Sequence, residues 1–264
     1  MATPTLWSPP PESLTLADDE YHLWRAALQC DAMRLRDLEG ALNEEEKLRA
    51  SKFLVPDARE RFVLSRNILR ELLGRYLGVS PSEITFSYGT YGKPFLDMPA
   101  SAAQIHFNVS HSHEYGAFVF ARGREVGIDI EKIRAEAAGE DIARRFFSQA
   151  EIQQLAAMPQ NERVAGFFAC WTKKEAYIKA RGEGLQIPLH SFSVSIAKAN
   201  WQELLSGDDV CWSVYPFEPA QGFAGAIASE GKGRGLQFWE WRWTKPSDSN
   251  RLGNQDRGRS EKIS

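Results

Sequence analysis

Residues 105–132 read IHFNVSHSHEYGAFVFARGREVGIDIEK, and this stretch decides which fold we expect. Apolar and polar residues alternate over Ile105–Val109, which predicts a half-buried strand. The segments Ala117–Ala121 and Glu125–Ile130 flank the glycine turn Arg122–Arg124, and this pattern predicts a β-hairpin. We therefore expect antiparallel sheet at the centre of the chain.

Helical periodicity lies on both sides of these strands. Asn43 precedes three glutamates, which predicts an N-cap and a helix that ends near Phe53. A longer helical pattern starts at Asp57 and is closed by Gly78. A third helix is expected over 161–180, and further strands over 84–88, 192–196, 212–217, 223–228 and 236–243. This order predicts an α+β fold of two pseudo-duplicated halves, each a long helix packed on a small antiparallel sheet.

The chain is expected to divide into four segments. Residues 1–41 form an N-terminal arm and the first elements, residues 42–130 the N-terminal α+β half, and residues 131–244 the C-terminal α+β half. Residues 245–264 are almost wholly polar, so we expect a disordered tail there.

The composition argues against several classes of protein. The 264 residues include 32 Lys and Arg against 35 Asp and Glu, so the net charge is −3 and no global basic field attracts nucleic acid or an anionic membrane. Cys30, Cys170 and Cys211 lie far apart, which argues against a disulfide framework or a zinc site. No apolar run approaches the roughly 20 residues of a membrane span, and the N-terminus lacks a basic segment followed by an apolar core. We expect a soluble, cytoplasmic protein.

Two pairs of charged residues have the spacing of a site. Asp129 and Glu131 are two apart in an expected strand, so both carboxylates lie on one face. Glu175 and Lys179 are four apart in an expected helix, so they share a helical face. A solvated strand end and a simple stabilising pair are the ordinary explanations. The surrounding stretch 167–185, which mixes charged with aromatic residues, favours a half-buried site.

Ser110 and His111 raise the question of a hydrolase. Adjacent residues on an extended chain point in opposite directions, and no Gly-x-Ser-x-Gly turn is present. A hydroxyl and an imidazole that both donate to phosphate oxygens are the better interpretation. Lys93 lies in the turn Tyr91–Pro94, where it either faces solvent or contacts a phosphate.

Taken together, four segments resemble the 4′-phosphopantetheinyl transferases of the larger, monomeric type that activates surfactin synthetase. The matching motifs are residues 91–94 (YGKP), 107–112 (FNVSHS), 126–132 (VGIDIEK) and 171–179 (WTKKEAYIK). The resemblance implies an enzyme that moves the 4′-phosphopantetheine arm of coenzyme A onto a serine of an acyl, peptidyl or aryl carrier protein. It also implies Mg²⁺ as the cofactor and adenosine 3′,5′-bisphosphate as the product.

The same resemblance implies roles for two groups of residues. The group that would hold Mg²⁺ comprises Asp129, Glu131 and Glu175. The group that would contact the phosphates and the nucleotide of coenzyme A comprises Arg49, Arg61, Lys93, Ser110 and His111. By the same resemblance, Lys179 would contact phosphate and help the leaving group or the base. Our hypothesis for catalysis is that Glu175 takes the proton of the carrier serine, directly or through a metal-bound water. Glu46 stands where some relatives carry a basic residue.

The physics of the acidic group supports a bound cation. Three carboxylates that converge to about 4 Å repel by roughly 4 kcal/mol per pair at an effective dielectric constant near 20. A divalent cation removes this repulsion. Mg²⁺ prefers oxygen ligands and completes its shell with water and substrate phosphates, so carboxylates together with a diphosphate are a suitable set.

Carrier domains are typically acidic helical bundles, so we expect a basic and apolar patch beside the site. The candidates for this patch are Arg144, Arg145, Phe146, Phe147, Lys173, Lys174 and Arg181. A solvated helix face explains each of these charges equally well.

Two other functions stay open beside the transferase. A Mg²⁺-dependent hydrolase of nucleotide anhydrides would use the same acids with water as the nucleophile. A carrier-binding module without turnover would keep the fold alone, although the intact acidic group disfavours it. Two halves in one chain predict a monomer, and the pathway of the carrier protein stays open.

Overall fold

The computed structural model describes residues 5–98, 104–197, 199–204 and 210–243. Its α-helices are α1 (Ala32–Gly40), α2 (Glu44–Ser51), α3 (Pro56–Leu77), α4 (Glu140–Phe146), α5 (Gln149–Ala157) and α6 (Arg163–Arg181). Its strands are β1 (Glu20–Ala27), β2 (Phe86–Tyr88), β3 (Pro94–Leu96), β4 (Ile105–Ser112), β5 (Tyr115–Arg122), β6 (Val126–Lys132), β7 (Gln202–Glu203), β8 (Trp212–Phe217), β9 (Phe223–Glu230) and β10 (Gly235–Trp241).

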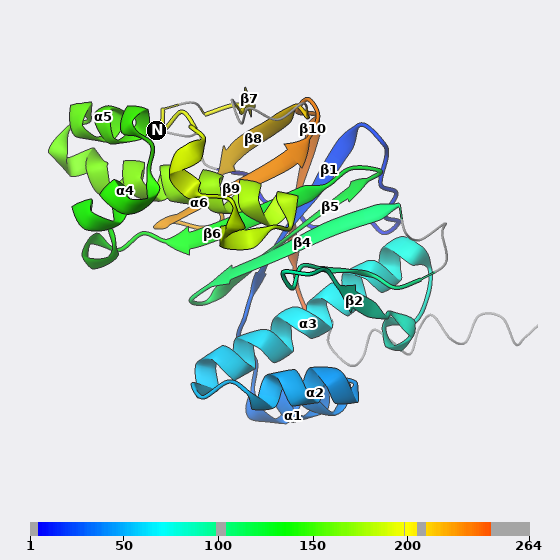
Figure 1. Ribbon diagram of the computed structural model, residues 1–264. Helices are drawn as coiled ribbons and strands as arrows, with labels where there is room; N and C mark the ends of the chain where they lie inside the picture. The colour runs from blue at the N-terminus through cyan, green and yellow to red at the C-terminus, as the bar shows by residue number, and fades with distance from the viewer. Residues whose placement is uncertain (1–4, 99–103, 198, 205–209, 244–264) are drawn as a thin grey trace, which may run out of the picture.

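Two four-stranded sheets lie between two long helices (Figure 1). The first sheet has the strand order β10-β1-β5-β4, and the second has the order β6-β9-β8-β7. Leu64 and Ile68 of α3 pack against Trp24 in the first sheet, and Tyr177 of α6 packs against Trp212 in the second. A third apolar cluster fills the space between the sheets. The expected α+β fold is confirmed, with one addition: β1 and β10 pair in parallel.

Local signals set the helix boundaries. Asn43 and Glu46 form a capping box, in which each side chain accepts the backbone N–H of the other residue, so α2 begins at the expected place. Gly78 ends α3 in the left-handed conformation, at φ 68°, which glycine adopts without steric cost. The long helices therefore begin and end within two residues of the predicted positions.

The hairpin expected over residues 117–130 is wrong. Both edges of β5 are taken, by β1 on one side and by β4 on the other, so β5 has no free edge for β6. β6 pairs with β9 in the second sheet instead. The turn at Gly123 therefore leads the chain from one sheet to the other.

The strand expected over residues 192–196 is also wrong. Its backbone amides donate to side chains rather than to a neighbouring strand. The amide of Val194 donates to Glu151 Oε1 over 2.7 Å, and that of Ile196 donates to Gln154 Oε1 over 3.1 Å. The alternating pattern there reflects an extended segment that α5 holds through its polar side chains.

The four expected segments stay a prediction. The strand pairings join distant parts of the chain, since β1 and β10 lie side by side in the first sheet. The tail expected over 245–264 lies outside the described residues. Within the described ranges, no helix combines the length and the apolar character that crossing a membrane requires.

Candidate active site

Asp129 on β6 is the centre of a polar cluster between β4 and α6. Lys179 Nζ lies 2.6 Å from Asp129 Oδ1, and Ser110 Oγ donates to the same oxygen over 3.0 Å. Lys179 Nζ also donates to Ser110 Oγ over 3.0 Å. The other oxygen, Oδ2, is buried and has no hydrogen-bond partner among the described residues. One carboxylate oxygen is thus fixed, while the second has unused acceptor capacity.

The two-residue period of β6 explains how the acidic residues reach this place. Ile128 and Ile130 are buried in the core between the sheets, and Asp129 and Glu131 lie on the opposite face. Gly127 shares that face, and a Cβ atom there would lie 2.2 Å from a backbone carbonyl oxygen of α6. The missing side chain lets α6 approach β6 closely, so that side chains of the helix reach the acidic face.

Three carboxylates share the electrostatic field of this cluster. Burial, Asp129 and Glu131 raise the pKa of Glu175 to about 7, although Lys179 acts in the opposite direction. Burial and the charge of Asp129 also raise the pKa of Glu131. Burial raises the pKa of Asp129 itself, despite the neighbouring Lys179. The structure therefore brings together Asp129, Glu131, Glu175, Lys179 and Ser110 from three elements that are distant in sequence.

The imidazole of His111 and the positive charge of Arg61 extend the cluster. His111 follows Ser110 on β4 and is exposed at the rim. Desolvation of its imidazole, then the positive charges of Lys179 and Arg61, lower the pKa of His111. An arginine, a lysine and an imidazole gathered beside carboxylates are suited to bind a polyanion.

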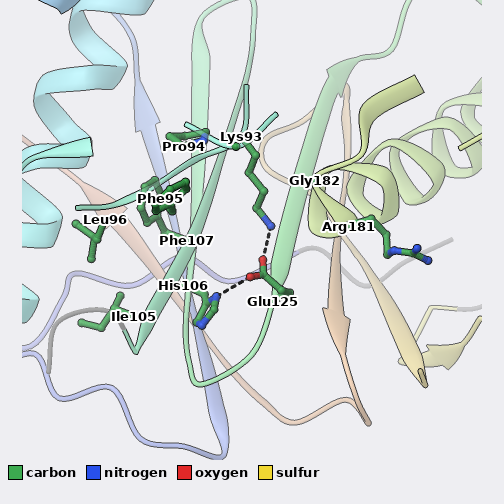
Figure 2. A pocket seen from close by; sticks show the side chains of 11 residues that line it. Lys93, Pro94, Phe95, Leu96, Ile105, His106, Phe107, Glu125, Arg181 and Gly182 are labelled. Atoms are coloured by element: carbon green, nitrogen blue, oxygen red, sulfur yellow. Dashed lines mark hydrogen bonds and ion pairs between the residues drawn. The ribbon is translucent and has the colours of Figure 1, made fainter. Parts of the chain in front are cut away.

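Lys93 belongs to a separate group of contacts. Its ammonium donates to Glu125 Oε2 over 2.5 Å, to the carbonyl oxygen of Ala180 over 2.6 Å and to that of Val126 over 3.2 Å. Figure 2 shows that Lys93 and His106 both contact Glu125. These residues line a cavity of about 400 Å³. All three ammonium hydrogens have protein acceptors, so the side chain ties its turn to β6 and α6.

Arg49 and Glu46 lie on α2, beside α3. The guanidinium of Arg49 stacks over the ring of Tyr88, 5.2 Å from its centroid. Glu46 is buried, and its carboxylate lies 2.9 Å from Arg70 and 3.6 Å from Arg66. Glu46 therefore neutralises two buried arginines, which explains an acid at this position.

Lys173 and Lys174 do not lie at the surface, so their expected place in a docking patch is wrong. Both side chains are fully buried. Lys174 Nζ lies 2.7 Å from Glu151 Oε1, and Lys173 Nζ donates to the carbonyl oxygen of Ser195 over 2.7 Å. Phe147 is buried as well. The candidates that keep exposed or partly exposed side chains are Arg144, Arg145, Phe146 and Arg181.

Two contacts at the site are not among those expected from the sequence. Ser112 Oγ donates to Glu131 Oε2 over 2.9 Å. Asn108 Oδ1 accepts the backbone N–H of Ile128 over 3.0 Å. The signal for both is the repeat of a polar residue at every second position of 108–112, which predicts that Asn108, Ser110 and Ser112 share one face of β4.

The donor set fits a hard cation, although the side chains do not enclose one as they stand. Among the described residues, no group of three His, Cys, Asp or Glu side chains is arranged to hold a metal ion. The positive charge beside Asp129 is that of Lys179. The unpartnered Oδ2 of Asp129 and the raised pKa of Glu175 nevertheless mark carboxylate oxygens that a divalent cation would satisfy.

Comparisons with known proteins identify the family. Residues 125–228 match the model of the 4′-phosphopantetheinyl transferase superfamily, and residues 31–122 match that of the 4′-phosphopantetheinyl transferase N-terminal region. The chain is similar to the 4′-phosphopantetheinyl transferase HetI of Nostoc sp., with 36% identity over 89% of this chain and 98% of the relative. It is also similar to Sfp of Bacillus subtilis, with 35% identity over 60% of this chain and 74% of the relative. The chain therefore belongs to the 4′-phosphopantetheinyl transferase family, in the larger type that includes Sfp, and it is an enzyme of that activity.

Proposed function

We propose that this enzyme uses Mg²⁺ to transfer the 4′-phosphopantetheine arm of coenzyme A to a serine of an apo carrier protein and releases adenosine 3′,5′-bisphosphate. The observation that supports this proposal most strongly is the cluster of Asp129, Ser110 and Lys179, with Glu131 and Glu175 in the same electrostatic field. Carboxylates beside a lysine and a rim of basic residues suit a cation together with a diphosphate.

Asp129, Glu131 and Glu175 would hold the Mg²⁺ ion. Bound Mg²⁺ would supply positive charge against the diphosphate and against the charge that develops on the leaving phosphate. Lys179 now neutralises Asp129, and its ammonium would turn to the phosphate oxygens of coenzyme A. Asp129 would therefore lie beside a positive charge both before and after coenzyme A binds, first that of Lys179 and then that of Mg²⁺.

Glu175 is the proposed general base. Its carboxylate shares the electrostatic field of Asp129 and Glu131, and a carboxylate placed beside the diphosphate suits proton abstraction from a serine hydroxyl. In the proposed step the serine oxygen forms a bond to the phosphorus nearest the pantetheine arm. The bond from that phosphorus to the oxygen of the adenosine bisphosphate breaks, and the serine proton passes to Glu175.

His111 and Arg61 are proposed to bind the phosphates at the nucleotide end of coenzyme A. The positive charges of Lys179 and Arg61 near His111 support this proposal. Arg49 is proposed as a further contact of the nucleotide. We propose that Lys93 contacts the nucleotide end of coenzyme A and that Ser110 contacts its phosphates. Both contacts require the present hydrogen bonds of these side chains to rearrange. The ammonium of Lys93 already has three acceptors, and the hydroxyl hydrogen of Ser110 is donated to Asp129.

The carrier protein is proposed to dock beside α4, where Arg144 and Arg145 are exposed. An acidic carrier surface would complement these charges and bring its serine toward Asp129. We further propose a cytoplasmic monomer that binds neither nucleic acid nor membrane. The net charge of −3 and the three free cysteines support this part of the proposal.

One experiment separates the proposed reaction from its alternatives. The full chain is incubated with coenzyme A, Mg²⁺ and either an apo acyl carrier or an apo peptidyl carrier protein, and intact masses are recorded. A carrier that gains one phosphopantetheine group is the expected result. Cleaved coenzyme A with an unchanged carrier would show a hydrolase, and no change in either would show a binding module. The same assay in EDTA should give no transfer.

The role of Glu175 is tested with Glu175→Gln. At saturating Mg²⁺, the rate of transfer should fall at least about 100-fold, since a positioned general base contributes on that order. Glu183→Gln is the matched control, because Glu183 lies just beyond the end of α6 and pairs with Arg181 instead. Undiminished turnover of the Glu175 variant would remove this residue from the mechanism.

A further inference from the structure

β4 and β6 are edge strands of different sheets, and they face each other without backbone pairing. Among the described strands, β4 pairs with β5, and β6 pairs with β9. Side chains of β4 take the place of a neighbouring strand by accepting backbone N–H groups of β6. These bonds join residues 20 apart in sequence: Asn108 with Ile128 over 3.0 Å, Ser110 with Ile130 over 3.3 Å, and Ser112 with Lys132 over 3.1 Å. The constant separation shows that the two strands run parallel in one fixed register.

Two of these three contacts also hold an acidic side chain. Ser110 donates to Asp129 over 3.0 Å, and Ser112 donates to Glu131 over 2.9 Å. In each case the carboxylate belongs to the residue just before the amide that the same serine accepts. The third contact, at Asn108, has a glycine in the corresponding position, so it fixes the backbone and no acid. The face of β4 therefore fixes the register of β6 and the direction of its carboxylates together.

The hydroxyl of Ser112 has little freedom to do anything else. A serine hydroxyl has one hydrogen to donate and two lone pairs to accept with. Ser112 is buried, donates to Glu131, accepts the N–H of Lys132, and lies 3.2 Å from His113 Nδ1. Its side chain thus holds Glu131 Oε2 in one direction relative to the strand.

We propose that Ser112 is a positioning residue that aims Glu131 at the cation site through this hydrogen bond. The inference rests on the proposed function, in which Glu131 binds Mg²⁺. Groups that hydrogen-bond a metal-binding carboxylate typically change metal affinity 10- to 100-fold when removed. Ser112→Ala removes the bond to Glu131 and also one contact between the strands, whereas Asn108→Ala removes a contact between the strands alone.

The test measures Mg²⁺ binding directly, from the rise in melting temperature of the full chain as Mg²⁺ is added without coenzyme A. Ser112→Ala should raise the Kd for Mg²⁺ about tenfold, and Ser112→Thr, which keeps the hydroxyl, should return the Kd to the wild-type value. Asn108→Ala should change this Kd less than about threefold. Ser87→Ala is a distant control, since it removes a serine–carboxylate bond of 3.0 Å to Asp97 at the surface.

The outcomes also separate this inference from the proposed function. If the wild-type chain neither binds Mg²⁺ nor needs it for transfer, the proposed function fails. If the wild type binds Mg²⁺ and Ser112→Ala matches it, the positioning role of Ser112 is overturned. An equal loss of Mg²⁺ affinity in Asn108→Ala would overturn it too, because the register of β6 against β4 would then explain the affinity without the bond to Glu131. Should Ser112→Ala fail to fold, Ser112→Cys keeps the size of the side chain with a weaker donor, and its affinity for Mg²⁺ should fall likewise.

Discussion

Replacing Glu175 with glutamine should make the protein more stable at neutral pH, although it removes the proposed general base. Burial and the neighbouring carboxylates Asp129 and Glu131 raise the pKa of Glu175 from 4.5 to about 7, against the opposing effect of Lys179. Ionising this side chain therefore costs free energy in the folded protein that it does not cost in the unfolded chain. Glutamine has the same shape and carries no such cost.

The sign and the size of the effect follow from the two pKa values. Between pH 4.5 and 7 the folded protein binds more protons at Glu175 than the unfolded chain does, so stability falls as the pH rises through this range. At about 1.4 kcal/mol for each unit of pKa, the full cost is roughly 3 kcal/mol, and it is complete only above pH 7. Between pH 5 and pH 8 the wild type should lose most of this, roughly 2–3 kcal/mol, through Glu175.

Urea unfolding in EDTA at pH 5, 6, 7 and 8 measures this difference. The free energy of unfolding of Glu175→Gln should exceed that of the wild type by an amount that grows by roughly 2–3 kcal/mol across the series. Glu183→Gln should follow the wild type throughout. Mg²⁺ added at pH 8 should stabilise the wild type more than Glu175→Gln. A constant difference between wild type and Glu175→Gln at all four pH values would refute the reasoning.

Three further variants test other parts of the structure. Lys174→Met leaves the carboxylate of Glu151 buried without its partner, so urea unfolding should show a loss of about 3–5 kcal/mol; a loss below about 1 kcal/mol would contradict the burial of this pair. Gly127→Ala places a methyl group 2.2 Å from a carbonyl oxygen of α6, so the melting temperature should fall by several degrees, and an unchanged value would contradict the close packing of helix and strand. Charge reversal at Arg144 and Arg145 should raise the KM for apo carrier about tenfold with the affinity for coenzyme A intact, and an unchanged KM would place the docking surface elsewhere.

The features that the sequence predicted correctly depend on neighbours along the chain. The capping box of Asn43 involves residues three apart, and Gly78 ends α3 through its own backbone angle. The same holds for the acidic face of β6, since the two-residue period alone separates Asp129 from Ile128. Such signals are contained in a few consecutive residues, so one sequence is enough to find them.

The features that the sequence predicted wrongly depend on competition between distant segments of the chain. The turn at Gly123 fits a hairpin as well as a crossing between sheets, and β1 and β4, which occupy both edges of β5, decide between them. Lys174 shows the same limit. A charged residue on a helix is usually exposed. The ion pair with Glu151, 23 residues earlier, and a hydrogen bond to the carbonyl oxygen of Phe192 offset the cost of burying this one.

The site itself combines both kinds of information. Helical period places Glu175 and Lys179 on one face of α6, and strand period places Asp129 and Glu131 on one face of β6. Neither periodicity predicts that these faces of α6 and β6 lie against each other. The meeting depends on Gly127, whose missing side chain removes the obstacle between helix and strand.

The junction of the two sheets explains why carboxylates are tolerated at this depth. An edge strand buried against another sheet leaves backbone N–H groups that need partners. Ser110 and Ser112 supply those partners, and a hydroxyl that accepts an N–H still has a hydrogen to donate to a carboxylate. An apolar side chain in place of Ser112 would remove the bonds to the amide of Lys132 and to Glu131 Oε2, and one in place of Ser110 would remove the bond to the amide of Ile130 and leave Asp129 Oδ1 to Lys179. The polar residues that close the gap between the sheets are therefore also those that keep Asp129 and Glu131 in place, so that joining the two sheets and building the site are one requirement on the sequence.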